Sequence, residues 1–205
     1  MCAKYLSVLV QALGVLGTLL LAAIAIWNKQ IIYWLAGPKL KLKLGPKGSR
    51  FVEAARCGIY YCHLFLTNER PSAPAEKVRV MMLALYRAGP QGNFLKIGPI
   101  APIQFTFPYP DVTGHDASPT VRSSIMCDFL VAGGTLEFCT YVQPMGFIPR
   151  VEPKEKVRVL IRAEAHNAVS NDLLVEICWD GTPLGEGHLV DEQVKIDEVD
   201  QGSLR

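Results

Sequence analysis

The chain lacks the short motifs that mark the common enzyme classes. It contains no phosphate-binding G-x-x-x-x-G-K-[ST] loop, no G-x-G-x-x-G turn, no H-E-x-x-H helix and no G-x-S-x-G elbow. Its six cysteines include no C-x-x-C pair, which excludes zinc knuckles and thioredoxin-type redox sites. We therefore predict that the protein is not an enzyme and has no catalytic residue, no metal and no cofactor.

A surplus of basic residues is also absent from most of the chain. The 21 Lys and Arg exceed the 19 Asp and Glu by two. Lys4 and Lys29 supply these two extra positive charges, because residues 1–37 contain no acid. The remaining chain carries 19 bases against 19 acids. A balanced domain attracts phosphate only weakly, and we expect no nucleic-acid partner.

Charge is missing altogether between Tyr5 and Trp27, where Leu, Val, Ile, Ala and Gly dominate. As a helix this run spans roughly 30 Å, the thickness of the hydrocarbon core of a bilayer. It predicts one N-terminal transmembrane α-helix in contact with membrane lipid, within an anchor and interfacial flank over residues 1–37. The A-x-A pattern at Ala23 to Ala25 leaves a cleaved signal peptide as the alternative, although the run is longer than the apolar region of about 7 to 15 residues typical of one.

Helical periodicity is absent after residue 37, and strand patterns take its place. Lys39 to Leu44 alternates lysine with leucine, which predicts a strand with the leucines buried and the lysines exposed. Both faces of Cys57 to Thr67 are apolar, which predicts a central strand. Asp180-Gly181 predicts a two-residue hairpin turn before a last strand near Gln193 to Val199. The other predicted strands are Lys77 to Arg87, Ile103 to Phe107, Arg122 to Val131, Thr135 to Val142, Lys156 to Ala165 and Leu173 to Trp179.

Roughly eight short strands with turns between them predict an all-β sandwich over residues 38–200, followed by a tail over 201–205. Within this domain, Thr67-Asn68, Ala75 and Val78-x-Val80 match the pattern T-N-x-x, loop, A-x-x-V-x-V. The pattern resembles that of bacterial immunoglobulin-like β-sandwiches. The resemblance implies that the Asn caps a turn and that the Ala packs beneath the next strand.

The order of motifs along the chain also resembles that of small bacterial single-pass membrane proteins. These motifs are an L-A-x-x-A-I-W helix end at Leu21 to Trp27, P-K-L at Pro38 to Leu40, A-x-N at Ala165 to Asn167, and W-D-G at Trp179 to Gly181. Together the two resemblances imply an immunoglobulin-like β-sandwich preceded by one transmembrane helix. They imply no activity.

Lysines flank the apolar run unequally, with Lys4 before it and five lysines within about 20 residues after it. The positive-inside rule therefore predicts a bacterial inner-membrane protein whose β-domain is cytoplasmic. The absence of any N-x-[ST] site agrees with this prediction. The five lysines are Lys29, Lys39, Lys41, Lys43 and Lys47.

Most of the cysteines lie in apolar strand-like runs, and we interpret them as small buried side chains in a reducing compartment. Cys127 and Cys139 flank Gly133-Gly134, and a disulfide across a hairpin is the alternative for this pair. His63 lies in the predicted central strand without a second ligand at metal spacing. We interpret it as a hydrogen-bonded histidine of the core or of an edge.

The basic face of the first predicted strand, formed by Lys39, Lys41 and Lys43, has two functional interpretations besides simple solvation. It either lies over anionic lipid headgroups, where each base contributes about 1 kcal/mol, or it pairs with the acidic last strand. Asp197 and Glu198 supply acid there.

Residues 89–120 differ from the rest, with ten Gly and Pro among 32 residues. Long connections of this kind are often functional, and Phe105, Phe107 and Tyr109 are the candidate contacts for a protein partner. The same rings can instead fill the open end of the sandwich. Asp111 to Asp116, which includes His115, offers a metal-assisted hydrolytic site, although the same residue types commonly build turns.

The sequence thus predicts a membrane-anchored β-sandwich for protein–protein interaction or structural support, without catalysis. An accessory subunit of a larger membrane complex is one alternative. A hydrolase that uses the loop from Asp111 to Asp116 is the other.

Overall fold

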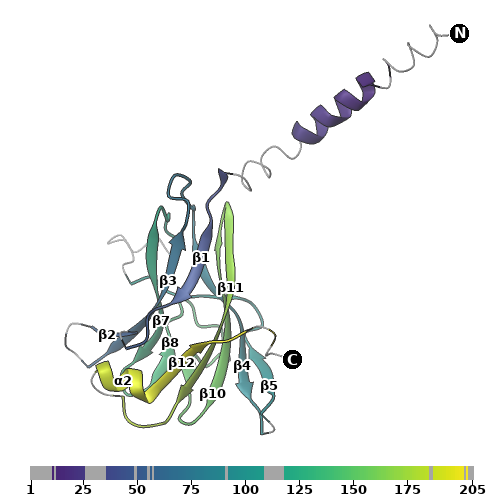
Figure 1. Cartoon of the computed structure of the whole chain (residues 1–205). Helices are drawn as coiled ribbons and strands as arrows, with labels where there is room; N and C mark the ends of the chain where they lie inside the picture. The colour runs from purple at the N-terminus through teal and green to yellow at the C-terminus, as the bar shows by residue number, and fades with distance from the viewer. Residues whose placement is uncertain are drawn as a thin grey trace, which may run out of the picture. The chain divides into compact units, whose positions relative to one another are not determined.

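A computed structural model describes residues 11, 13–25, 36–48, 50–54, 56, 58–90, 92–108, 118–184, 187–200 and 202 (Figure 1). The chain divides into two compact units, Met1–Gly37 and Pro38–Arg205. In the described residues, the first unit is helical and the second is built mainly from strands.

Residues 13–25 of the first unit form an α-helix. The hydroxyl of Thr18 donates a hydrogen bond of 2.8 Å to the carbonyl of Gly14, one turn earlier. Within the described part of the chain, no helix is both long enough and apolar enough to cross a membrane. Residues 5–10, 12, 26 and 27 of the predicted span lie outside the described residues, as do the interfacial residues 28–34.

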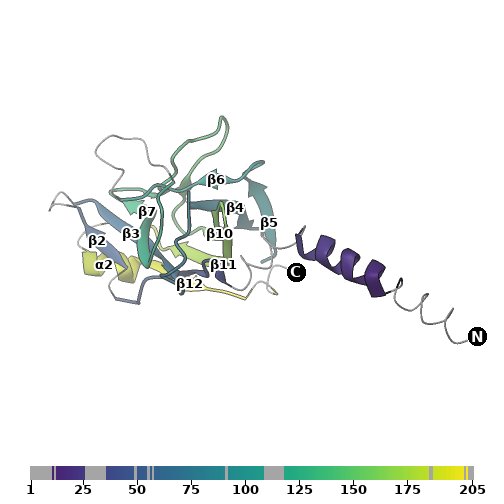
Figure 2. The same cartoon turned by 90° about the horizontal axis from the view of Figure 1, so that it is seen from above.

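The second unit consists of two antiparallel sheets (Figures 1 and 2). The first sheet contains, in spatial order, β1 (Leu40–Leu44), β3 (Tyr60–Asn68), β7 (Ser124–Ala132), β8 (Leu136–Phe138) and β9 (Arg150–Val151), with β2 (Phe51–Glu53) also paired to β3. The second contains β12 (Val194–Glu198), β11 (Ala168–Trp179), β10 (Lys156–Ala165), β4 (Arg79–Ala88) and β5 (Phe94–Gly98), with β6 (Ile103–Gln104) also paired to β4.

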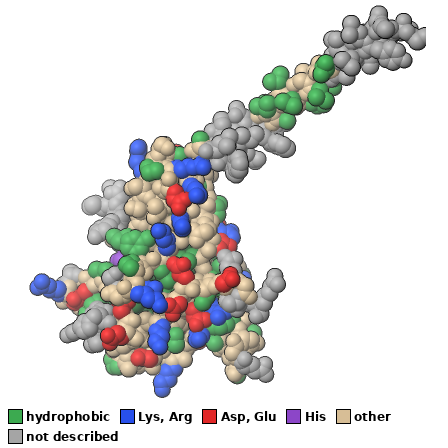
Figure 3. Space-filling view, in the orientation of Figure 1, with side chains coloured by type: hydrophobic (Ala, Val, Ile, Leu, Met, Phe, Trp, Pro, Cys, Tyr) green, Lys and Arg blue, Asp and Glu red, His purple; other side chains and the backbone are tan. Residues whose placement is uncertain are grey.

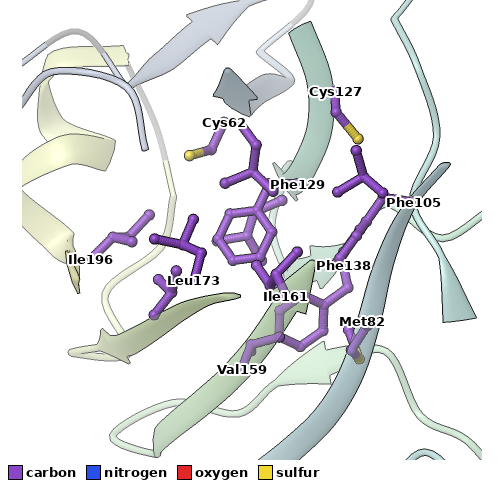
Figure 4. Packing of buried hydrophobic residues seen from close by; sticks show 14 of the residues in the cluster. Cys62, Met82, Phe105, Cys127, Phe129, Phe138, Val159, Ile161, Leu173 and Ile196 are labelled. Carbon is purple, nitrogen blue, oxygen red and sulfur yellow. The ribbon is translucent and has the colours of Figure 1, made fainter. Parts of the chain in front are cut away.

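The hydrophobic core lies between the sheets and belongs entirely to the second unit. Leu64 and Leu66 of β3 are fully buried, because alternate residues of this strand face inward. Val159 and Ile161 of β10 are fully buried from the other sheet, and Figure 4 shows their packing. All buried members of the core cluster lie within residues 40–196. The second unit therefore contains its own core, and we expect it to fold without the helix.

These sheets confirm the prediction of a mostly β domain with a sandwich arrangement. β10 has the predicted bounds, and β3 is central, since it pairs with β1 on one side and β7 on the other. Leu40 and Leu42 are buried while the lysines between and beside them are exposed, as the alternation in β1 predicts.

The connection between the last two strands differs from the prediction. Asp180-Gly181 does not form a two-residue hairpin, because a loop and the helix α2 (Gly187–Gln193) separate β11 from β12. Asp180 instead closes a local turn, in which its Oδ1 accepts hydrogen bonds from the amide and hydroxyl of Thr182, at 2.8 and 2.7 Å. The sequence shows no helical periodicity there because a helix of 7 residues is too short to display it.

Asn68 and Ala75 hold the loop between β3 and β4. Asn68 is buried, and its Oδ1 accepts hydrogen bonds from the amides of Lys39 and Arg70, each at 3.1 Å. Its Nδ2 donates to the carbonyls of Ala73 at 2.7 Å and Val121 at 3.3 Å. Ala75 is fully buried and forms a bridge with Val121. Asn68 therefore caps this loop with all four of its side-chain hydrogen bonds made.

Candidate functional site

The aromatic residues predicted to contact a partner divide between the core and its margin. Phe105 has no exposed surface, and its ring meets that of Phe129 edge to face, with the centroids 5.6 Å apart at 69°. The contact interpretation is therefore wrong for Phe105, which belongs to the core, as Figure 4 shows. Phe107 is also buried, although its ring borders a surface hollow. Tyr109 and the whole loop from Asp111 to Asp116 lie outside the described residues.

Phe105 is buried because its segment crosses from one sheet to the other. The amide of Phe105 donates to the carbonyl of Val80 in β4, at 2.9 Å, and the amide of Thr106 donates to the carbonyl of Cys139, at 3.0 Å. Thr106 in turn accepts a hydrogen bond from the amide of Asp128, at 2.9 Å. The segment thus closes one side of the sandwich, and its inward ring fills the space between the sheets.

The basic residues of β1 are exposed, as predicted. Lys39 forms an ion pair of 2.7 Å with Glu69, and the hydrogen bond from Lys39 lowers the pKa of that carboxyl below its ordinary value. Lys47, rather than the lysines of β1, pairs with Asp197 of β12, at 3.0 Å. Lys41 and Lys43 form no ion pair with any described residue. Figure 3 shows Lys and Arg side chains gathered over the position of β1.

His63 and Asp128 form a buried polar pair on the outer face of the first sheet. They are cross-strand partners in β3 and β7, and Nδ1 of His63 lies 2.9 Å from Oδ1 of Asp128. Both atoms are buried, and neither makes a hydrogen bond with a described residue. The ring of Tyr61 lies nearly parallel to that of His63, with the centroids 6.4 Å apart. His63 is therefore a nearly buried residue of the sheet in close contact with Asp128, and its interpretation as a hydrogen-bonded histidine stays a prediction.

A β-bulge produces this pairing. The register of β3 and β7 shifts between Cys62 and His63, so that Cys62 faces Leu130 while His63 faces Asp128. Phe129 is the extra residue, and its ring fills the core. The sequence carries no signal for Asp128, because a carboxylate inside an apolar strand has no motif and its partner depends on the register.

A polar hollow borders the pair, and a second hollow, called the outer hollow, lies next to it. The polar hollow has a volume of about 390 Å³, and the outer hollow beside it has a volume of about 410 Å³. Pro108 lines both of them, and mostly apolar side chains line the outer hollow. The polar hollow is lined by Val52, Glu53, Ala54, Tyr61, His63, Pro108 and Asp128, and the outer hollow by Phe65, Phe107, Pro108, Ser124, Ile125 and Met126.

The cysteines closest to Asp128 do not supply a reactive nucleophile. Cys127 and Cys139 are free thiols, so the alternative of a disulfide between them was wrong. Burial raises the pKa of both thiols well above the ordinary value, and the nearby Asp128 carboxylate adds to this effect. The thiol of Cys127 also donates to the carbonyl of Thr106, at 3.1 Å. Protonated, buried thiols are poor nucleophiles, which argues against thiol chemistry at this face.

Comparison of the whole chain with protein-family models, with curated proteins and with solved structures finds no match. Among the described residues, no three His, Cys, Asp or Glu side chains are grouped so that they can hold a metal ion. The outer hollow, together with the lysines of β1 beside it, is a candidate contact site on the surface of the second unit.

Proposed function

We propose that this chain is a bacterial single-pass membrane protein whose immunoglobulin-like β-sandwich binds a protein partner and carries out no catalysis. In this proposal the helix and its uncharged flanks anchor the chain in the inner membrane, and the β-domain is cytoplasmic. The partner is a subunit of the same membrane or a protein recruited to it. The outer hollow is the observation that carries the proposal.

The outer hollow has the composition of a contact site for an apolar side chain. Five of its six lining residues are Phe, Pro, Ile or Met, and a concave apolar surface on a folded domain usually marks a binding site. Met126 is exposed and Phe65 half-buried, so both are accessible to a partner. Met adapts its shape to different apolar side chains, which suits a recognition surface.

Two lysines beside the hollow indicate that the partner segment is acidic. Lys43 is the cross-strand partner of Phe65, and Lys41 is the cross-strand partner of Thr67, so both lysines project next to the hollow on the same outer face. Neither pairs with a described acid. A partner segment with an apolar side chain for the hollow and acidic side chains for the two lysines fits this arrangement.

The immunoglobulin-like assignment and the anchor are parts of the same proposal. The capping bonds of Asn68 and the burial of Ala75 support the former, because the resemblance implies these roles. The helical state of residues 13–25, inside the run without charge from Tyr5 to Trp27, supports the anchor.

Purification of the full chain in mild detergent tests the proposal. We expect a stoichiometric protein partner that is retained by the wild type, lost with Met126→Asp, and lost with the pair Lys41→Glu and Lys43→Glu. Val169→Asp is the matched control, because Val169 is an exposed apolar residue of the other sheet. The control is expected to retain the partner, and all variants are expected to keep the wild-type melting temperature within a few degrees.

Two results contradict the proposal. One is a partner that is retained by Met126→Asp and by the lysine variant alike. The other is binding of residues 38–205 to anionic liposomes that the lysine variant abolishes, without any protein partner that depends on Met126. The second result assigns the lysines to lipid.

A further inference from the structure

The polar hollow and the outer hollow follow each other along β3 and β7. Phe65 and Met126 are cross-strand partners, and both line the outer hollow. His63 and Asp128 are the next pair on the same face of these strands, and both line the polar hollow. Side chains two residues apart on one face of a strand are separated by roughly 6.6 Å. The two hollows, which share Pro108 in their lining, are therefore one such step apart.

The polar hollow has an acidic lining. Glu53 and Asp128 contribute two carboxyl groups, and none of the described residues that line the hollow is Lys or Arg. Glu53 is exposed and accepts a hydrogen bond from the amide of Gly58, at 3.2 Å. No Lys or Arg in the described ranges forms an ion pair with either carboxylate. The hollow therefore attracts a positively charged group.

Asp128 is the buried member of this lining. The residue is 8% exposed, and its Oδ1 is buried against Nδ1 of His63 in a contact of 2.9 Å that is not a hydrogen bond. A carboxylate removed from water loses hydration free energy, and hydrogen bonds or an opposite charge must offset this loss. The part of the side chain that remains accessible faces the hollow that it lines. A cationic donor in the hollow would supply the missing compensation.

Two aromatic rings in the lining favour a guanidinium over an ammonium group. The rings of Tyr61 and His63 lie within 6° of parallel, and both line the hollow, whose volume is about 390 Å³. A guanidinium is planar and weakly hydrated, so it stacks on aromatic faces while its N–H groups bind a carboxylate. An ammonium group is a strongly hydrated point charge. The lining therefore suits arginine better than lysine.

We propose that the polar hollow binds an arginine of the partner segment whose apolar side chain fills the outer hollow, with the two side chains two residues apart. Both hollows then contact one segment, so this inference rests on the proposed function. An extended segment that follows β3 and β7 repeats their step of roughly 6.6 Å between side chains on one face. A side chain two residues from the apolar one therefore reaches Asp128.

The charges on either side of the outer hollow give the segment an order of side chains. Lys41 is the cross-strand partner of Thr67. Thr67 lies beyond Phe65 as counted along β3 from His63, so the surface changes from basic through apolar to acidic. A segment with an acid, an apolar side chain and an arginine at alternate positions matches this surface. The opposite alignment places like charges against each other.

Fluorescence anisotropy with labelled peptides and the full chain in mild detergent tests the proposal. The probe is acetyl-Glu-Ser-Leu-Ser-Arg-amide, together with the peptide of reversed order, because the charges fix the side chains and leave the chain direction open. The matched control peptides carry citrulline, which has the shape of arginine without its charge. We expect the better arginine peptide to bind with a Kd at least about tenfold lower than its citrulline counterpart.

Three variants locate this preference for arginine. Asp128→Asn keeps the shape of the side chain without its charge and is expected to abolish the preference, while the citrulline peptide binds as before. Glu53→Gln is expected to reduce the preference, and it tests the hollow at an exposed residue should Asp128→Asn lower the melting temperature. Glu192→Gln is the matched control, since Glu192 is exposed on α2 and the charge change is the same. It is expected to retain the full preference.

Three results overturn the proposal, and they separate it from the proposed function. Equal binding of the arginine and citrulline peptides, lost in both cases with Met126→Asp, leaves the outer hollow as a contact site and removes the arginine from the polar hollow. A preference for arginine that survives both Asp128→Asn and Glu53→Gln assigns the charge effect to another part of the surface. Absence of binding by every peptide contradicts the outer hollow as a contact site as well.

Discussion

The side chain of Asn171 pairs with the backbone of Leu42 through two hydrogen bonds, one to its amide and one to its carbonyl, at 2.9 and 3.2 Å. Asn171 belongs to β11 of the second sheet, and Leu42 lies at the edge of the first. A single amide side chain thus takes the place of a neighbouring strand. It joins the two sheets along the side of the sandwich opposite β5.

Asn171→Ala is expected to destabilise the domain by about 1–3 kcal/mol, because it leaves the amide and the carbonyl of Leu42 without their partners. Urea unfolding of residues 38–205 measures this loss. Val169→Ala, two residues earlier in the same strand, is the control and is expected to change the stability by less than about 0.5 kcal/mol. Equal stability of the two variants would show that the bonds to Leu42 contribute nothing.

Asn68→Asp is expected to destabilise the domain by about 1–3 kcal/mol. An aspartate keeps the oxygen that accepts from Lys39 and Arg70 but lacks the NH₂ group that donates to Ala73 and Val121. The Asn68→Asp variant is also expected to show faster amide hydrogen exchange in the loop that follows residue 68. Unchanged stability together with unchanged exchange contradicts a capping role for this residue.

Phe105→Ala is expected to cost about 3–5 kcal/mol, the range for emptying a fully buried aromatic site. Met126→Ala, in the outer hollow, is expected to cost less than about 1 kcal/mol because Met126 is 37% exposed. Thermal melting of the two variants separates core from contact surface. A Phe105→Ala variant as stable as Met126→Ala would contradict the assignment of Phe105 to the core.

Glu176 makes the stability depend on pH. Burial alone would raise its pKa, but hydrogen bonds from Lys156 and Arg158 outweigh burial and lower the pKa below the ordinary value of 4.5. A carboxyl with a lowered folded-state pKa contributes stability above its unfolded pKa and loses that contribution as the pH falls through the folded value. Its contribution is therefore complete at pH 7 and declines below about pH 4.5.

Glu176→Gln is accordingly expected to lower the stability by about 1–2 kcal/mol at pH 7, and the difference from the wild type is expected to shrink as the pH falls below 4.5. Melting temperatures between pH 3 and pH 7 measure both effects. The control is Glu192→Gln, since Glu192 is exposed and forms no ion pair with a described residue. If the melting temperatures of Glu176→Gln and the wild type differ by the same amount across this pH range, ionisation of Glu176 does not contribute to the pH dependence of stability.

The buried thiols of Cys62 and Cys127 are expected to resist alkylation. Burial raises the pKa of Cys62 to about 12, and Cys127 is completely buried. Iodoacetamide at pH 8 is therefore expected to label these two cysteines only after unfolding, while the partly exposed Cys178 serves as the internal comparison. Peptide mass spectrometry without reduction is expected to show Cys127 and Cys139 as free thiols, and a linked peptide would overturn the assignment.

The pattern of the sequence determines the strands whose environment is regular. Lys156 to Ala165 alternates cleanly, and β10 has these bounds. In β1 the period-two pattern also determines which face is buried, because a strand has only two faces and only one of them meets the core. Such local rules depend on neighbouring residues alone, and the sequence contains them completely.

The tertiary structure decided the features that join distant segments. Asp128 meets His63 because a bulge shifts the register of β7, and Phe105 is buried because its segment crosses between the sheets. Asn171 reaches Leu42 from 129 residues away. No periodicity and no motif in the sequence indicates any of these three contacts. Register and sheet order select which side chains meet, and both depend on how the whole core packs.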